Sequence, residues 1–296
     1  MRVTNNMLVM NFMNDYNKNL ERLQKDQNML STREKVSKPS DDPVAVANIL
    51  KIKTEIARND AYTKNTDDAK SWLSLTDTAL GQIGDLLQSA RDLAVQGSNG
   101  TLTQSDMQSI AAQVDQIKQQ LIQVGNTQYN GRYIFAGYKT DTKPFSDSNN
   151  GYAGDDGVIQ FEVGAGGNRI QVNVTGDKVF DVSGGTSQLL NVMDNLSNAL
   201  KSGNNQTVSN IIGDIDNQLQ NVLAIRADAG AKANRIDLTA NRLSDDNYNF
   251  TALLSKNQDA DIAEVITNLK MDVNVYRASL ASGAMIIQPS LVDFLR

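Results

Sequence analysis

Paired aspartates are the residues whose types and spacing could support chemistry in this chain. They occur as Asp67-Asp68, Asp155-Asp156 and Asp245-Asp246. Neighbouring carboxylates suit a divalent cation or acid–base catalysis. Asp155-Asp156 is followed by glycine, but the ligand spacing and the closing glutamate of an EF-hand loop are missing. The sequence therefore favours a surface turn at this pair and solvated helix faces at the other two.

A fourth pair, Asp41-Asp42, lies between Pro39 and Pro43 in the most distinctive short motif of the chain. As metal ligands these carboxylates lack enough partners. Aspartate is favoured as a helix N-cap and proline at the first helical position, so a helix is expected to begin at Pro43 with Asp42 as its cap. Pro39 disfavours helix in the residue before it, so the preceding helix must end nearby. Pro39, Asp41, Asp42 and Pro43 are predicted to form a joint between two helices.

Histidine and cysteine are both absent from the 296 residues. Their absence removes thiolate nucleophiles, serine–histidine triads, imidazole or thiolate metal sites and disulfides. The sequence also has no recognisable phosphate loop or dinucleotide fingerprint. We therefore expect a protein that is not an enzyme and that uses no cofactor or metal.

Charge and hydropathy exclude two further classes of partner. Lys and Arg total 28 against 34 Asp and Glu, a net charge of -6, whereas nucleic-acid binding needs clustered cations. No run of eighteen apolar residues is present, so we expect no membrane insertion. The first residues lack the apolar core of a secretory signal, so export is expected to use no cleavable leader.

Both ends of the chain carry apolar residues at the three- and four-residue spacing of one helix face. A helix with a single apolar face needs a partner, and the two terminal helices suggest each other or a neighbouring copy of the chain. This pattern points to a protein that assembles. The predicted assembly seam comprises Val3, Met7, Met10, Leu20, Leu23, Leu269, Val273, Tyr276, Leu280, Ile287, Leu291 and Phe294.

Between the ends, two further helices are predicted to fold back on each other. Apolar residues from Met107 to Val124 alternate steps of three and four, and the preceding apolar stripe ends at a turn signal, 97–100. Two helices joined by so short a break should pack antiparallel. Thr103 with Asp106 three residues later is typical of an N-terminal cap.

The middle of the chain has a different composition. Nine of the 20 glycines lie between residues 139 and 185. Two runs rich in β-branched residues, 158–163 and 169–174, flank a glycine-rich stretch, 164–168, which predicts a hairpin. A small β-rich insert is therefore expected at 141–185.

These elements predict a mainly α fold. It is a long antiparallel helical rod of the coiled-coil or bundle type, formed by the N- and C-terminal segments, with a small β-rich domain inserted in the middle of the chain. The terminal helices are expected at 1–38 and 271–296, the helical rod domain at 39–140 and 186–270, and the insert at 141–185.

Four stretches of this sequence resemble a known family. They are Met1-Arg2-Val3-Thr4, the segment from Leu30-Ser31-Thr32 to Pro43, Gly131-Arg132-Tyr133-Ile134-Phe135-Ala136-Gly137 with Pro144-Phe145, and Gln288 to Leu295. In this order they resemble the hook-associated protein 3 family, the hook–filament junction proteins of the bacterial flagellum and relatives of flagellin. The family usually has a glycine and a basic residue after Leu-Ser-Thr, where this chain has Arg33-Glu34-Lys35.

The resemblance implies a function and a set of partners. The terminal helices would form an inner tube, the rod the next layer, and the β insert the outer face of a ring of copies. The ring would join the hook, through hook-associated protein 1, to flagellin. The protein would be extracellular, in the flagellum, after type III export, with a cytoplasmic export chaperone on its C-terminal helix, 273–295. The alternative is a flagellin-type filament subunit that polymerises by itself.

Overall fold

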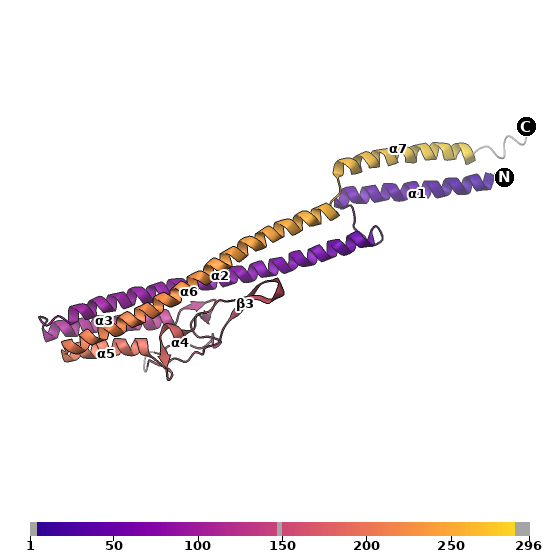
Figure 1. The fold of residues 1–296 in the computed structure, drawn as a ribbon. Helices are drawn as coiled ribbons and strands as arrows, with labels where there is room; N and C mark the ends of the chain where they lie inside the picture. The colour runs from indigo at the N-terminus through magenta and orange to yellow at the C-terminus, as the bar shows by residue number, and fades with distance from the viewer. Residues whose placement is uncertain (1–4, 147–149, 288–296) are drawn as a thin grey trace, which may run out of the picture. The chain divides into compact units, whose positions relative to one another are not determined.

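The computed structural model describes residues 5–146 and 150–287, and its fold is mainly α-helical, as predicted. The chain divides into two compact units, one of residues 1–58 with 246–296 and one of residues 59–245. Figure 1 shows the elements. In chain order they are α1 (Asn5–Thr32), α2 (Pro43–Gly97), α3 (Gln104–Gly125), β1 (Gln128–Tyr129), β2 (Arg132–Tyr133), β3 (Gln160–Gly164), the 3-10 turn η1 (Ala165–Gly167), β4 (Asn168–Gln171), α4 (Gly176–Val179), β5 (Val182–Ser183), β6 (Thr186–Ser187), α5 (Gln188–Ser202), α6 (Asn205–Gln258) and α7 (Ile262–Ile287).

In the unit of residues 59–245, parts of α2 and α6 run antiparallel and share a core with α3 and α5. Ion pairs between α2 and α6 follow an antiparallel order, since the partner numbers on α6 fall as the α2 numbers rise. Their side chains are largely exposed, so the pairs contribute little to stability. All three pairs are nevertheless consistent with an antiparallel alignment of α2 and α6. The pairs are Lys70–Asp237 at 2.7 Å, Asp77–Arg226 at 2.9 Å and Arg91–Asp216 at 2.6 Å.

Local capping fixes where these helices begin and end. α2 ends at Gly97, as predicted, and Thr103 and Asp106 form a complete capping box at the start of α3. The Thr103 hydroxyl donates to the Asp106 carboxylate at 2.7 Å, and this hydrogen bond lowers the pKa of Asp106. α5 ends at Ser202 and is capped by Gly203, whose φ of 70° is the left-handed conformation that glycine adopts without strain.

The predicted hairpin is confirmed in the middle of the chain. β3 and β4 pair antiparallel, with Phe161 opposite Ile170, and η1 fills the connection between them. β1–β2 and β5–β6 are two further antiparallel pairs. The strands therefore run from Gln128 to Ser187 and extend beyond the predicted insert of 141–185 at both ends.

The β1–β2 hairpin lies in a stretch that the sequence interpretation included in the helical block. Asn130 and Gly131 have φ values of 48° and 77°. Two consecutive left-handed residues of the type Asn-Gly make the tight turn that joins two antiparallel strands. This local turn preference ends the helical pattern after Gly125, and the chain pairs Gln128 with Tyr133.

The residues after this hairpin form the base of the β region. Ile134, Phe135 and Ala136 are fully buried. The Phe145 ring lies 4.1 Å from the ring of Phe180, centroid to centroid. The Tyr152 hydroxyl donates to the backbone carbonyl of Phe135 at 2.8 Å. The Tyr-Ile-Phe-Ala-Gly and Pro-Phe stretches that carry the family resemblance therefore build a packed aromatic core.

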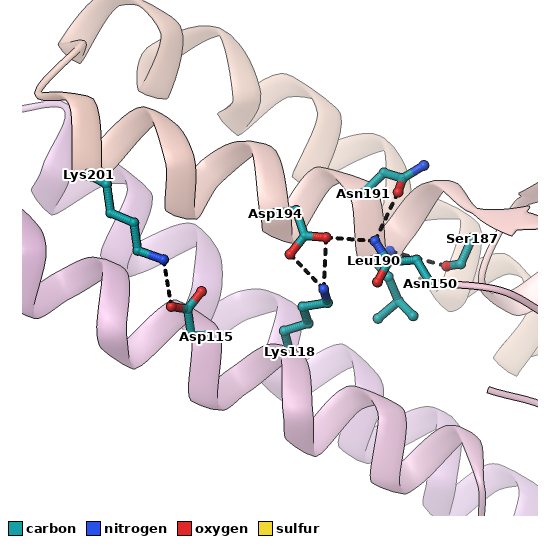
Figure 2. A network of polar contacts seen from close by, with 8 residues as sticks. All are labelled: Asp115, Lys118, Asn150, Ser187, Leu190, Asn191, Asp194 and Lys201. Atoms are coloured by element: carbon teal, nitrogen blue, oxygen red, sulfur yellow. Dashed lines mark hydrogen bonds and ion pairs between the residues drawn. The ribbon is translucent and has the colours of Figure 1, made fainter. Parts of the chain in front are cut away.

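A polar network attaches the β region to the helices (Figure 2). Lys118 of α3 donates to both carboxylate oxygens of Asp194 on α5, at 2.6 and 2.8 Å. The side-chain amide of Asn150, with only 6% of its surface exposed, donates to Asp194 at 2.6 Å and to Asn191 at 3.0 Å. A buried amide that satisfies two acceptors fixes the approach of its loop to α5.

Candidate assembly surface on the terminal helices

α1 and α7 pack side by side and antiparallel within their unit (Figure 1). The Tyr16 and Tyr276 hydroxyls lie 3.2 Å apart, and their ring centroids are separated by 5.6 Å. Phe12 stacks on Tyr16 and lies against Gly283, where a side chain would overlap the ring. The absence of a side chain at residue 283 thus lets the two helices approach closely here.

The contact between α1 and α7 also contains acidic residues. Asp26 has 8% of its surface exposed, on the α1 face that packs against α7. Its burial raises the pKa of the carboxyl group, the negative charge of Asp272 on α7 raises it further, and the nearby Lys25 and Arg22 lower it. A buried acid beside a second acid weakens the contact at neutral pH and restricts which alignments of the helices are acceptable.

A further set of large apolar side chains, spread around the solvent-exposed side of the described parts of both helices, is exposed in the single chain. These side chains are between 36% and 76% exposed, although exposed residues of such helices are normally polar. α7 has no charged residue from Ala278 to Ile287. The exposed face comprises Met7, Leu8, Met10, Met13 and Leu20 of α1 with Ile266, Met271, Val275, Leu280 and Met285 of α7.

The predicted seam residues are divided between the packed face and the exposed face. Those that are half-buried are Leu23, Leu269, Val273 and Tyr276. Those that are exposed are Met7, Met10, Leu20 and Leu280. Val3, Leu291 and Phe294 lie outside the described residues, as does the side chain of Ile287. Contact of the exposed members with other copies stays a prediction.

The predicted joint takes the expected local form. α2 begins at Pro43, and the Asp42 carboxylate accepts hydrogen bonds from the backbone N–H groups of Val44 and Ala45, at 3.0 and 2.9 Å. Asp41 accepts from the backbone N–H of Lys38 at 3.1 Å. Asp42 therefore caps α2, and Asp41 closes the turn that precedes the helix. In the segments that the structure describes, no group of three or more acidic side chains is placed to hold a metal ion.

Comparison with known proteins identifies the family. Residues 3–140 match the bacterial flagellin N-terminal helical region. The flagellar hook-associated protein 3 of Escherichia coli strain K12 is 31% identical over 272 residues, which cover 84% of this chain and 86% of that protein. The chain belongs to the flagellar hook-associated protein 3 family.

Other relatives agree with membership of this family of structural flagellar proteins. A solved flagellar hook-associated protein from Vibrio parahaemolyticus is 28% identical, with a TM-score of 0.68 over 74% of this chain and all of that structure. The flagellin of Bacillus subtilis strain 168 is 28% identical over 303 residues, which cover 97% of this chain and 96% of that flagellin. The chain is thus a flagellin-like structural protein of the bacterial flagellum. None of its described helices is both long and apolar enough to span a membrane.

The contact between the terminal helices of this hook-associated protein 3 relative includes residues that sequence reasoning missed. Val265 is buried, and so are Asp26 and Gly283. Phe12 was also missed, although it lies four residues before Tyr16 at the spacing of one helix face. That spacing was the available signal for Phe12. Val265 likewise lies four residues before Leu269. An aspartate and a glycine carry no apolar signal, so periodicity could not identify Asp26 and Gly283.

Proposed function

We propose that the chain is a mechanical adaptor that joins the flagellar hook to the flagellin filament. Several copies pack their α1/α7 pairs into a ring, which sits on hook-associated protein 1 and offers flagellin a surface on which to grow. The observation that carries this proposal is the exposed apolar face of α1 and α7. Burying half of each exposed side chain would contribute roughly 1 kcal/mol per residue, so about ten of them favour association strongly.

The proposal gives each part of the chain a role. The terminal helices form the inner layer, the helical unit of residues 59–245 forms the layer around it, and the β region faces outward. No step in this role requires an active site or a cofactor. Before export through the flagellar type III apparatus, a cytoplasmic chaperone covers the apolar C-terminal helix, residues 273–295, because an exposed face of this kind favours premature association.

The experiment uses isolated hooks capped with hook-associated protein 1. Purified protein is added, and electron microscopy with antibody labelling measures its incorporation at the hook tip. The Met10→Asp variant places a charge on the exposed apolar face and should reduce incorporation about tenfold, the effect of roughly 1.4 kcal/mol. Circular dichroism should remain unchanged because Met10 is 65% exposed.

The matched control is Asn11→Asp, which introduces the same charge at the next residue. Successive side chains of a helix point about 100° apart, so this variant keeps the Met10 side chain and tests whether a negative charge on α1 is by itself enough to reduce incorporation. Val275→Asp and Asn274→Asp provide the same comparison on α7, where both residues are exposed. Equal incorporation of the members of both pairs would show that the face takes no part in assembly.

A flagellin-type subunit that polymerises unaided is the alternative function. The near full-length similarity to a Bacillus subtilis flagellin favours it. The two functions differ in what purified protein does alone. An adaptor adds a short stack to a capped hook and then stops, whereas a filament subunit forms long filaments, and electron microscopy of the protein without hooks distinguishes these outcomes.

A further inference from the structure

The methionines of this chain are unevenly distributed between the two units. Eight of the nine lie in the described residues, and the five of these that are exposed all lie on α1 and α7. Within the described residues, the methionines of the other unit are Met107 and Met193, which are 3% and 1% exposed. The exposed five are Met7 at 50%, Met10 at 65%, Met13 at 47%, Met271 at 55% and Met285 at 76%.

The composition of the chain makes these methionine side chains its most accessible targets for peroxide. The chain contains no cysteine, so no thiolate competes for a peroxide. Hydrogen peroxide transfers one oxygen atom to the thioether sulfur, which loses two electrons, while the peroxide is reduced to water. No bond of the protein breaks, and the product is methionine sulfoxide.

We propose that the exposed methionines of α1 and α7 form a reversible oxidation site that switches off the assembly surface of the free subunit. A sulfoxide is polar and a strong hydrogen-bond acceptor, so it binds water. An assembly surface must be desolvated when copies of the chain pack against it. Oxidation of several of the five therefore converts an apolar face into a hydrated one. Methionine sulfoxide reductases return the side chains to thioethers.

The side chains that hold α1 to α7 are not themselves oxidised, although Met271 borders the contact and lines a pocket together with Arg22 and Asp26 of α1. That contact uses Phe12, Tyr16, Tyr276 and Gly283, none of which contains a thioether. The buried methionines in the core of the other unit are shielded from peroxide. Oxidation is thus expected to change the surface of the terminal helices while both units stay folded.

The first measurement concerns oxidation alone. Free full-length protein is treated with hydrogen peroxide, and peptide mass spectrometry follows each methionine with time. The five exposed side chains should oxidise at least about tenfold faster than Met107 and Met193, because oxidation follows exposure. Equal rates in the two groups would overturn the proposal without reference to assembly.

The second measurement connects oxidation to assembly and rests on the proposed function. Peroxide-treated protein should lose about tenfold in incorporation at capped hooks, and methionine sulfoxide reductases A and B should restore it. A variant with leucine at all five positions should incorporate to the same extent with and without peroxide treatment. If this variant does not incorporate, wild-type protein provides the test instead. The sulfoxide content of the protein recovered from hooks is then compared with that of the unbound protein.

The outcomes separate the two proposals. If untreated wild-type protein does not incorporate at capped hooks, the proposed function fails. If untreated protein incorporates and fully oxidised protein incorporates equally well, the oxidation switch fails while the proposed function stands. Sulfoxide enriched in the unbound fraction supports the switch, and equal sulfoxide in both fractions refutes it.

Discussion

Replacing Gly283 by alanine should loosen the contact between α1 and α7. A Cβ atom at this position would lie 2.7 Å from Cε1 and 2.9 Å from Cε2 of Phe12, and closer still to Cζ. Carbon atoms that are not bonded prefer separations of about 3.5–4.0 Å. The Phe12 ring must therefore rotate away from Tyr16, or the helices must separate.

The magnitude follows from two opposing effects. Alanine in a helix interior is favoured over glycine by roughly 0.5–1 kcal/mol, because it loses less backbone entropy on folding. Overpacking a tight contact costs typically about 1–3 kcal/mol. The net effect should be a loss of about 1–2 kcal/mol in the free energy of opening the pair, which corresponds to roughly 5- to 30-fold faster amide exchange.

Hydrogen exchange followed by mass spectrometry measures this change directly on peptides of α1 and α7. Gly230→Ala on α6 is the matched control, because a Cβ at Gly230 meets nothing within 4 Å. That variant should show the propensity gain alone, as slower exchange in α6. The double variant Phe12→Leu with Gly283→Ala should recover part of the loss. Slower exchange of α1 and α7 in Gly283→Ala would refute the close-packing argument.

Three further variants test other contacts. Because burial and Asp272 raise the pKa of Asp26, the α1/α7 pair should be most stable below the ordinary aspartate pKa of about 3.9 and weaken as pH rises through the raised value. Asp26→Asn should remove this pH dependence of amide exchange. Arg33→Gly should stabilise the end of α1 by about 1 kcal/mol, seen as slower exchange, because Arg33 has a φ of 61°. Asn150→Asp places a carboxylate against Asp194 and should cost about 2–3 kcal/mol in urea unfolding followed by tryptophan fluorescence.

The boundaries of several helices could be predicted because capping is a local property. Asp42 and Pro43 start α2, and Thr103 with Asp106 starts α3, as the sequence indicated. Each cap involves residues at most three positions apart, so a short stretch of sequence contains all the partners. The mainly α fold and the β3–β4 hairpin follow from the same kind of short-range periodicity and turn chemistry.

The partner of each apolar stripe could not be predicted in the same way. α1 has one apolar stripe with Phe12 and Tyr16, which contacts α7, and another with Met7 and Met10, which is exposed. Periodicity identifies apolar positions but does not say which partner covers them. The sequence interpretation therefore placed Leu23, which is half-buried, in a single seam with the exposed Met7 and Met10. Asp26 escaped notice because a buried acid carries no apolar signal.

The two connecting segments next to the terminal helices are residues 33–42, between α1 and α2, and residues 259–261, between α6 and α7. They are better understood as one joint than as two independent hinges. The backbone N–H of Lys35 donates to the carbonyl of Gln258 at 2.7 Å, and that of Ala260 donates to the carbonyl of Arg33 at 3.0 Å. These two bonds pair the segment that follows α1 with the segment that precedes α7. Bending at one segment alone would break these two bonds, and each contributes about 0.5–1.5 kcal/mol net where water can replace the lost partner, as at the exposed residues Arg33 and Lys35. In the proposed ring, each α1/α7 pair would therefore move as a unit, with Phe12 and Tyr16 keeping their contacts to α7.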